Sequence, residues 1–124
     1  MATEPKVVDA SALAAILFGE PRAAEVASRL GDALLFAPTL LRYEIASVCL
    51  KKLALYLKRR RAILKALSFL DELDLREMEV SADEVVILPR RKNLTAYDAS
   101  YLWLARSLDL ELVTLDQKLA RSSK

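Results

Sequence analysis

The chain has 124 residues, of which 54% are hydrophobic, and a formal net charge of +2, so one domain over residues 1–124 with a real apolar core is expected. It has no histidine and one cysteine, which excludes Ser-His-Asp and Cys-His catalysis, the common zinc sites and an internal disulfide. No apolar run is long enough to span a bilayer and the N-terminus lacks a signal-peptide pattern, so we expect a cytoplasmic protein with no membrane contact.

The spacing of apolar residues predicts strands and helices in alternation. In chain order, the expected elements are a strand over 6–9, helices over 12–18 and 21–30, a strand over 34–37, helices over 40–56 and 58–73, a strand over 76–80, a helix over 96–108, a strand over 110–115 and a helix over 117–121. Alternation of this kind is typical of an α/β fold in which helices cover both faces of a parallel sheet.

Helix ends are marked by familiar capping and breaking residues. Ser11, Thr39 and Thr95 each suit the N-cap of the helix that follows. Residues 82–92 are ambiguous, because a run of four apolar residues suits a strand while the flanking charges suit a helix broken near Pro89.

Four acids lie within apolar runs or directly after them: Asp9, Glu44, Asp98 and Asp116. Burying an uncompensated carboxylate is costly, so such residues are usually paired or bound to a cation. Asp9 and Asp116 follow predicted parallel strands, and ligands bind beyond the carboxyl ends of such strands. Together the four acids predict one site of hard oxygen ligands, suited to Mg²⁺ or Mn²⁺.

Each acid taken alone also has a structural explanation. Asp9 and Asp116 could cap the helices that follow them. Asp98 lies three residues after a predicted capping threonine, where the helix dipole also favours an acid. Glu44 could pair with Arg42, although its place beside the apolar stripe of its helix argues against a purely exposed residue.

Four segments resemble, in order and spacing, the motifs of one family. They are Val7–Leu13 (VVDASAL), Pro38–Ala46 (PTLLRYEIA), Leu94–Leu102 (LTAYDASYL) and Leu112–Asp116 (LVTLD). The chain is similar to PIN domains over nearly its whole length, and within that family it resembles the VapC-type toxins of toxin–antitoxin pairs.

The resemblance implies a PIN-like three-layer α/β/α sandwich with a parallel sheet of four or five strands, since little sequence after Asp116 remains for a last strand. It also implies a Mg²⁺- or Mn²⁺-dependent endoribonuclease whose acidic pocket is formed by the four acids, with Ser11 and Thr114 as supporting polar residues. The implied partners are RNA, a VapB-like antitoxin and a second copy of the chain. Basic residues predicted to contact phosphates are Arg42, Lys51, Lys52, Arg90, Arg91 and Lys92.

Three other functions compete with this interpretation. A non-catalytic PIN-like binding module would keep the fold without cleaving RNA, and a PIN nuclease of RNA processing or DNA repair would have another substrate. A phosphoacceptor receiver domain is disfavoured, because Asp9 has no adjacent acid and the second predicted strand ends in Ala37-Pro38.

Overall fold

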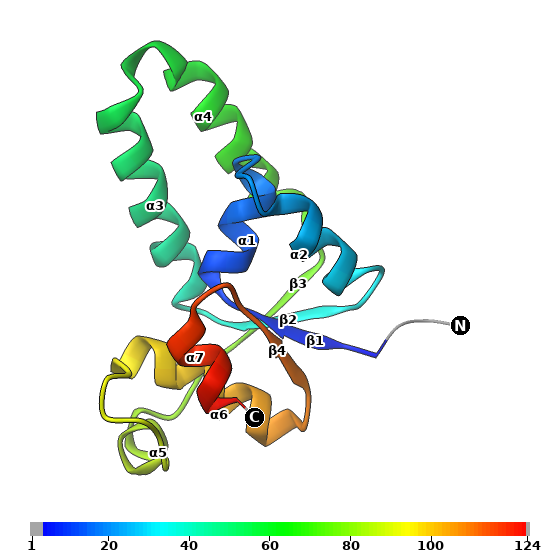
Figure 1. The fold of residues 1–124 in the computed structure, drawn as a ribbon, viewed down its shortest axis with the longest axis vertical. Helices are drawn as coiled ribbons and strands as arrows, with labels where there is room; N and C mark the ends of the chain where they lie inside the picture. The colour runs from blue at the N-terminus through cyan, green and yellow to red at the C-terminus, as the bar shows by residue number, and fades with distance from the viewer. Residues whose placement is uncertain (1–3, 124) are drawn as a thin grey trace.

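A parallel β-sheet forms the centre of the computed structural model, which describes residues 4–123 (Figure 1). Its four strands are β1 (Lys6–Val8), β2 (Leu35–Pro38), β3 (Leu75–Met78) and β4 (Glu111–Val113). They are ordered β3-β2-β1-β4, and each neighbouring pair is parallel. All four carboxyl ends therefore lie at one edge of the sheet, as the alternating sequence pattern predicted.

Helices cover both faces of the sheet, so the three-layer α/β/α fold is confirmed (Figure 1). They are α1 (Ala10–Leu17), α2 (Ala23–Leu30), α3 (Leu41–Leu55), α4 (Arg60–Ser68), α5 (Ala82–Ile87), α6 (Ala96–Leu108) and α7 (Gln117–Ser122). One face is covered by α1 and α2, and the other by α6 with α7 beside it. Helix α6 packs against β1, β2 and β4 and buries residues on several sides, which explains its apolar sequence.

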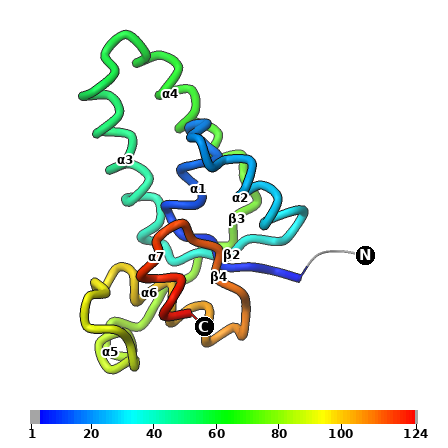
Figure 2. Tube along the Cα trace, viewed as in Figure 1, coloured from blue at the N-terminus to red at the C-terminus, as the bar shows by residue number. Residues whose placement is uncertain are grey.

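Helices α3 and α4 pair into an arm that projects from the sheet (Figure 2). They are joined by a 3₁₀ turn, Leu57–Arg59, and a second turn, Phe69–Glu72, leads from α4 toward β3. Near the sheet, α3 buries Leu41 and Ile45 in the core, but the far end of the arm carries exposed leucines. The arm therefore has more apolar surface than its own packing requires.

The core depends on side chains that let the layers approach closely. Val7 and Val8 of β1 are fully buried, and the alanines of α1 bring that helix close to the sheet. Gly31 ends α2 with a positive φ of 54°, a conformation that glycine adopts without steric cost.

No helix in the region from residue 4 to 123 is long and apolar enough to cross a membrane.

Several details differ from the sequence expectations. The segment after β3 is helical, because Ser81 caps α5 at the backbone N–H of Glu84, so the strand alternative was wrong. Asp9, not Ser11, is the N-cap of α1, and α3 begins after Leu40 without a side-chain cap, so Thr39 is not its cap. The predicted cap of α6 by Thr95 is confirmed.

Candidate active site at the carboxyl edge of the sheet

Asp9 follows β1 and is the most deeply buried of the four acids, at 5% exposure. Its Oδ1 accepts hydrogen bonds from the backbone N–H of Ala12 at 3.0 Å and from Ser11 Oγ at 2.7 Å. Its Oδ2 accepts one from Thr114 Oγ1 at 2.6 Å. Burial raises the pKa of Asp9 more than these bonds lower it, and the charge of Asp116 raises it further. Asp9 is a fixed carboxylate without a cation beside it among residues 4–123.

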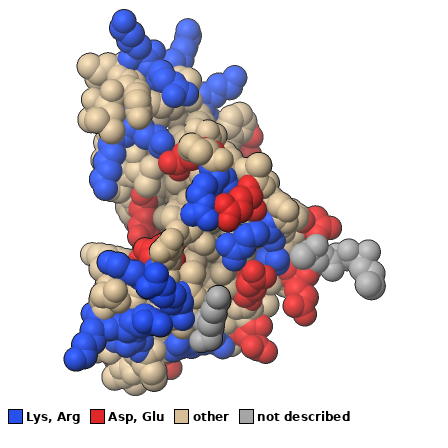
Figure 3. Space-filling view, in the orientation of Figure 1, with Lys and Arg blue, Asp and Glu red and all other residues tan. Residues whose placement is uncertain are grey.

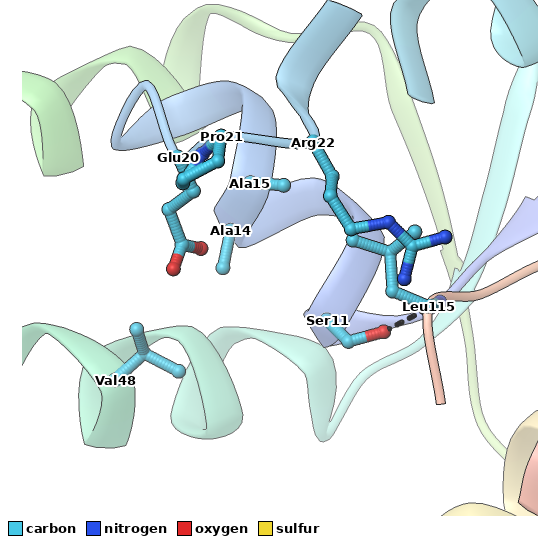
Figure 4. A pocket seen from close by; sticks show the side chains of 8 residues that line it. All are labelled: Ser11, Ala14, Ala15, Glu20, Pro21, Arg22, Val48 and Leu115. Carbon is cyan, nitrogen blue, oxygen red and sulfur yellow. Dashed lines mark hydrogen bonds between the residues drawn. The ribbon is translucent and has the colours of Figure 1, made fainter. Parts of the chain in front are cut away.

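Polar side chains around Asp9 tie the start of α1 to the loop after β4. Ser11 Oγ accepts a hydrogen bond from the backbone N–H of Leu115 at 2.9 Å (Figure 4). Thr114 Oγ1 accepts one from the N–H of Asp116 at 3.0 Å while donating to Asp9. The parallel register of β1 and β4 makes these contacts possible, because the residues just beyond both strands lie side by side. Ser11 and Thr114, predicted as supporting residues, thus orient two of the predicted acids.

Glu44 lies in the first turn of α3 and is half-buried. Its Oε1 accepts a hydrogen bond of 2.5 Å from the hydroxyl of Tyr101, a buried residue of α6. Burial raises the pKa of Glu44, and the charges of Asp9 and Asp98 add to this, although the Tyr101 bond opposes it. Burial and the same contact raise the pKa of Tyr101 far above its ordinary value, so Tyr101 remains a donor. The alternative of a Glu44–Arg42 ion pair was wrong.

Sequence reasoning missed the role of Tyr101. Tyr101 lies in the third family motif, to which no role beyond Asp98 is assigned from the sequence, yet it lies three positions after Asp98 and so shares a helix face with it. That spacing was the available signal. A buried tyrosine also needs a partner for its hydroxyl, and a predicted acid on a neighbouring helix is a suitable acceptor.

Asp98 and Asp116 complete the group from α6 and α7. The backbone N–H of Asp98 donates to Thr95 Oγ1 at 3.1 Å, and its half-buried carboxylate accepts no hydrogen bond from the residues that the structure describes. Asp116 caps α7, and its Oδ1 accepts from the N–H groups of Lys118 at 2.8 Å and Leu119 at 3.2 Å. Asp9 and Asp116 do cap helices, as the alternative explanation predicted, and each also lies close enough to the other for its charge to matter.

The four acids form one electrostatic group. Asp116 acts on the pKa of Asp9, and both Asp9 and Asp98 act on the pKa of Glu44, in each case raising it. Within residues 4–123, no three carboxylates are already arranged to hold a metal ion. By donor type the group nevertheless fits a hard divalent cation, because all its ligands are carboxylate oxygens and their mutual repulsion is unrelieved.

Two hollows open beside the acids. One of about 490 Å³ lies between α1 and α3 and includes Ser11 in its lining (Figure 4). Another, of about 250 Å³, includes Glu44 in its lining together with Leu40, Tyr43, Ser47 and Tyr97. Of the four acids, Glu44 lines the second hollow, and the first hollow reaches Ser11, the hydrogen-bond partner of Asp9.

The basic residues predicted to contact phosphate differ in how freely they can do so. Arg42 is engaged by two carboxylates, since its Nη1 lies 2.7 Å from Asp71 Oδ1 and its Nε lies 2.8 Å from Glu77 Oε1. Lys52 Nζ lies 3.4 Å from Glu20 Oε2 and 5.5 Å from the centre of the Phe18 ring. In this conformation both side chains join parts of the fold.

The remaining predicted basic residues are exposed. Lys51 lies on α3, and the loop between α5 and α6 carries Arg90, Arg91 and Lys92. Arg90 donates to the backbone carbonyls of Val86 and Leu88. Figure 3 shows Lys and Arg side chains at the tip of the arm and over the part of the molecule formed by α5, α6 and α7, with acidic and further basic side chains mixed between them. Contact between these exposed basic residues and RNA phosphates stays a prediction.

Comparison with known proteins identifies the protein family. Residues 6–124 match the PIN domain, and the chain belongs to the PIN domain family. Among solved structures, PAE2754 from Pyrobaculum aerophilum is 29% identical and has a TM-score of 0.74, covering 97% of this chain and 85% of that one. VapC20 of Mycobacterium tuberculosis, a toxin that cleaves the sarcin-ricin loop, shares the fold with 15% identity and a TM-score of 0.67, over 96% of this chain and 94% of its own. The curated proteins contain no match to the chain.

Proposed function

We propose that this protein is a Mg²⁺- or Mn²⁺-dependent endoribonuclease, built as a single nuclease domain over residues 1–124, and that it is the toxin of a VapBC-type pair in the cytoplasm. The observation that carries the proposal is that each of the four acids influences, or is influenced by, the charge of at least one other. Asp9 is also buried with no cation beside it among the residues that the structure describes. Membership of the PIN domain family and the fold shared with a toxin that cleaves RNA support the same conclusion.

In this proposal Asp9 and Asp98 would hold the metal directly, and Glu44 and Asp116 would hold it directly or through water. Bound divalent ions supply positive charge against the phosphate and lower the pKa of water. The contribution of the chain itself is orientation. Ser11 and Thr114 fix both oxygens of Asp9, and Tyr101 fixes one oxygen of Glu44, so little side-chain freedom remains to be lost when the site is filled.

The proposed reaction is hydrolysis of an RNA phosphodiester within the strand. Water attacks phosphorus, the bond from phosphorus to the 3′ oxygen breaks, and the products carry a 5′-phosphate and a 3′-hydroxyl. The anionic substrate would be repelled by four uncompensated acids, so cleavage should require added metal and stop in EDTA.

The decisive experiment compares two substitutions of the same kind. Asp9→Asn should abolish cleavage of a labelled RNA in Mg²⁺ or Mn²⁺ while leaving the fold intact, because the amide keeps the shape and the capping oxygen. Asp109→Asn is the matched control, since Asp109 is exposed at the opposite end of α6 from Asp98 and has a φ of 54° that asparagine tolerates.

The outcomes separate the competing functions. Full activity of Asp9→Asn would refute the site. A folded wild-type protein that cuts no nucleic acid in either metal would favour the non-catalytic module. Cleavage mapped on tRNA, rRNA, mRNA and DNA would separate a toxin from a nuclease of RNA processing or DNA repair.

We further propose that the larger hollow receives an apolar segment of the antitoxin. Figure 4 shows Ala14 of α1 and Val48 of α3 on its two walls, with Glu20 and Arg22 at the turn between α1 and α2. The hollow also includes Ser11, which bonds Asp9, so a bound segment would lie next to the acids. A neighbouring small gene encoding a DNA-binding protein would supply the partner for testing.

Charge placed in this hollow should prevent capture of the partner. Val48→Glu should lose co-purification with the co-expressed neighbour while retaining cleavage, and Ala24→Glu, on the exposed side of α2, should retain both. Co-purification of the Val48→Glu variant at the wild-type level would assign the partner to another surface.

The chain is also proposed to form a homodimer. Its support is apolar surface left exposed on the arm and α5, contributed by Leu50, Leu55, Leu57, Val86 and Ile87. Light scattering of the purified protein should give twice the monomer mass, and a monomer at all concentrations tested would contradict this.

A further inference from the structure

Two tyrosines next to the acids are exposed to an unusual degree. Tyr43 directly precedes Glu44 and is 81% exposed, while Tyr97 directly precedes Asp98 and is 64% exposed. They lie on different helices, α3 and α6, and are 54 positions apart. Exposing a large aromatic ring forgoes the burial that otherwise stabilises the fold, so their position calls for a contact outside the monomer core.

The two rings share one hollow with an acid. The hollow of about 250 Å³ is lined by Tyr43 and Tyr97 together with Leu40, Glu44 and Ser47. Tyr97 and Leu40 also line a second hollow of about 240 Å³, whose other walls come from the end of β2, from α5 and from the start of α6. Tyr97 therefore lines two hollows, and one of them is also lined by the acid Glu44.

This placement matches the geometry of a nucleotide. A phosphate held at the acids carries its own sugar and base, and the base must occupy space adjacent to that phosphate. The faces offered here are aromatic and aliphatic, which suits stacking of any base. A base inside a duplex is already stacked on its neighbours, so such a surface selects an unpaired strand, a loop or an end.

The neighbouring charge favours RNA over a protein in these hollows. Arg91 and Lys92 are exposed in the loop that leads into α6, the helix that carries Tyr97, and can contact flanking phosphates. An apolar protein surface laid on the same hollow would cover the carboxylate of Glu44 without offering it a compensating group. A nucleotide bound there, by contrast, offers that carboxylate hydrogen-bond donors, namely the exocyclic N–H groups of its base and its ribose hydroxyls.

We propose that Tyr43 and Tyr97 form a stacking subsite for one or two unpaired bases beside the scissile phosphate. This inference rests on the proposed ribonuclease function. It adds two substrate-binding residues that belong to none of the four acids or their hydrogen-bond partners.

The test measures binding without cleavage. Anisotropy of a fluorescein-labelled, unstructured RNA decamer is followed in low salt with Ca²⁺ in place of Mg²⁺ or Mn²⁺, so that a hard cation offsets the acids. Gel analysis verifies that the RNA stays uncut. The proteins compared are the wild type, Tyr43→Ala/Tyr97→Ala and Tyr43→Phe/Tyr97→Phe. The alanine pair should weaken binding roughly 5- to 150-fold for each stack removed, and the phenylalanine pair should stay within about twofold of the wild type. Tyr56→Ala is the matched control, because Tyr56 is exposed on the arm and lines a hollow away from the acids.

A second comparison identifies the base as the contacted group. The same decamer with abasic sites should bind the wild type as weakly as intact RNA binds the alanine pair, and the two changes together should add little. Equal affinity of wild type and alanine pair for intact RNA would overturn the proposal. A dimer that becomes a monomer in the alanine pair would also overturn it, by assigning both rings to a protein interface.

Failure of the function and failure of the subsite give different results. Binding that depends on both tyrosines in a protein that cleaves nothing would refute the nuclease and retain the subsite. Metal-dependent cleavage with the wild-type KM and kcat in the alanine pair would retain the nuclease and refute the subsite.

Discussion

Replacing Thr114 by valine keeps nearly the same volume but removes a hydroxyl that bonds both the carboxylate of Asp9 and the backbone N–H of Asp116. The variant loses the 2.6 Å hydrogen bond to the Asp9 carboxylate and the 3.0 Å bond from the Asp116 N–H. The first is a bond to a charged group, worth about 1.5–3 kcal/mol, and the second is neutral, worth about 0.5–1.5 kcal/mol. Because Thr114 is 4% exposed, water cannot replace either bond, and the free energy of unfolding should fall by about 2–4 kcal/mol at pH 8.

The pH dependence of that loss distinguishes this reasoning from a simple packing defect. Burial raises the pKa of Asp9, so at pH 4 a larger fraction of its carboxyl group is protonated in the folded state than at pH 8, and less of the lost bond is to a charged group. The loss of stability should therefore be smaller at pH 4 than at pH 8. Urea unfolding in EDTA at both pH values measures it, with the exposed Thr39→Val as a control expected to change stability by less than about 0.5 kcal/mol. An equal loss at pH 4 and pH 8 would refute the charged hydrogen bond.

Three other outcomes are expected. The folded pKa values of Asp9 and Glu44 exceed their ordinary 3.8 and 4.5, so the wild type in EDTA should lose stability as the pH rises from about 4 through those folded values. Thermal melts should show this loss. Saturating Mg²⁺ or Mn²⁺ at pH 8 should raise the melting temperature of the wild type but not of Asp9→Asn. Tyr101→Phe should move the rise of cleavage with pH to higher pH, because Glu44 loses the donor that favours its charged form; an unchanged pH–rate profile would contradict this. Arg42→Ala should cost at most about 1 kcal/mol in urea unfolding, since its two ion pairs are partly exposed, and an accompanying large loss of RNA affinity would show that Arg42 exchanges them for phosphate.

The parts of the fold that were predictable are those with strong local signals. Val7 and Val8 are β-branched residues in a short apolar run, and both are fully buried in β1. Thr95 precedes an apolar helical pattern and caps α6 as expected. The alternation of such elements was enough to place Asp9 and Asp116 at one edge, because parallel strands fix the direction of every carboxyl end.

The features that were missed depend on contacts between distant segments. Arg42 and Glu77 are 35 positions apart, and Glu44 and Tyr101 are 57 apart, so no local pattern assigns either pair. Competition between neighbouring caps was also unresolved: Asp9 and Ser11 are both good capping residues, and burial of the carboxylate decided between them. In the α5 segment, the four apolar residues favoured a strand and the flanking charges favoured a helix, so the sequence left both open; in the structure only Val85 and Leu88 of the four are at least partly buried.

The side-by-side placement of β1 and β4, visible in Figure 2, has a consequence for the order in which the molecule is made. Asp9 is synthesised 105 residues before its partner Thr114. A growing chain can form α1, α2 and the arm, whose contacts are close in sequence, but β1 has no β4 beside it until Glu111–Val113 have been synthesised. Until then Asp9 can be held by its near neighbours Ser11 and Ala12 but not by Thr114, so one of its two carboxylate oxygens lacks its partner during translation.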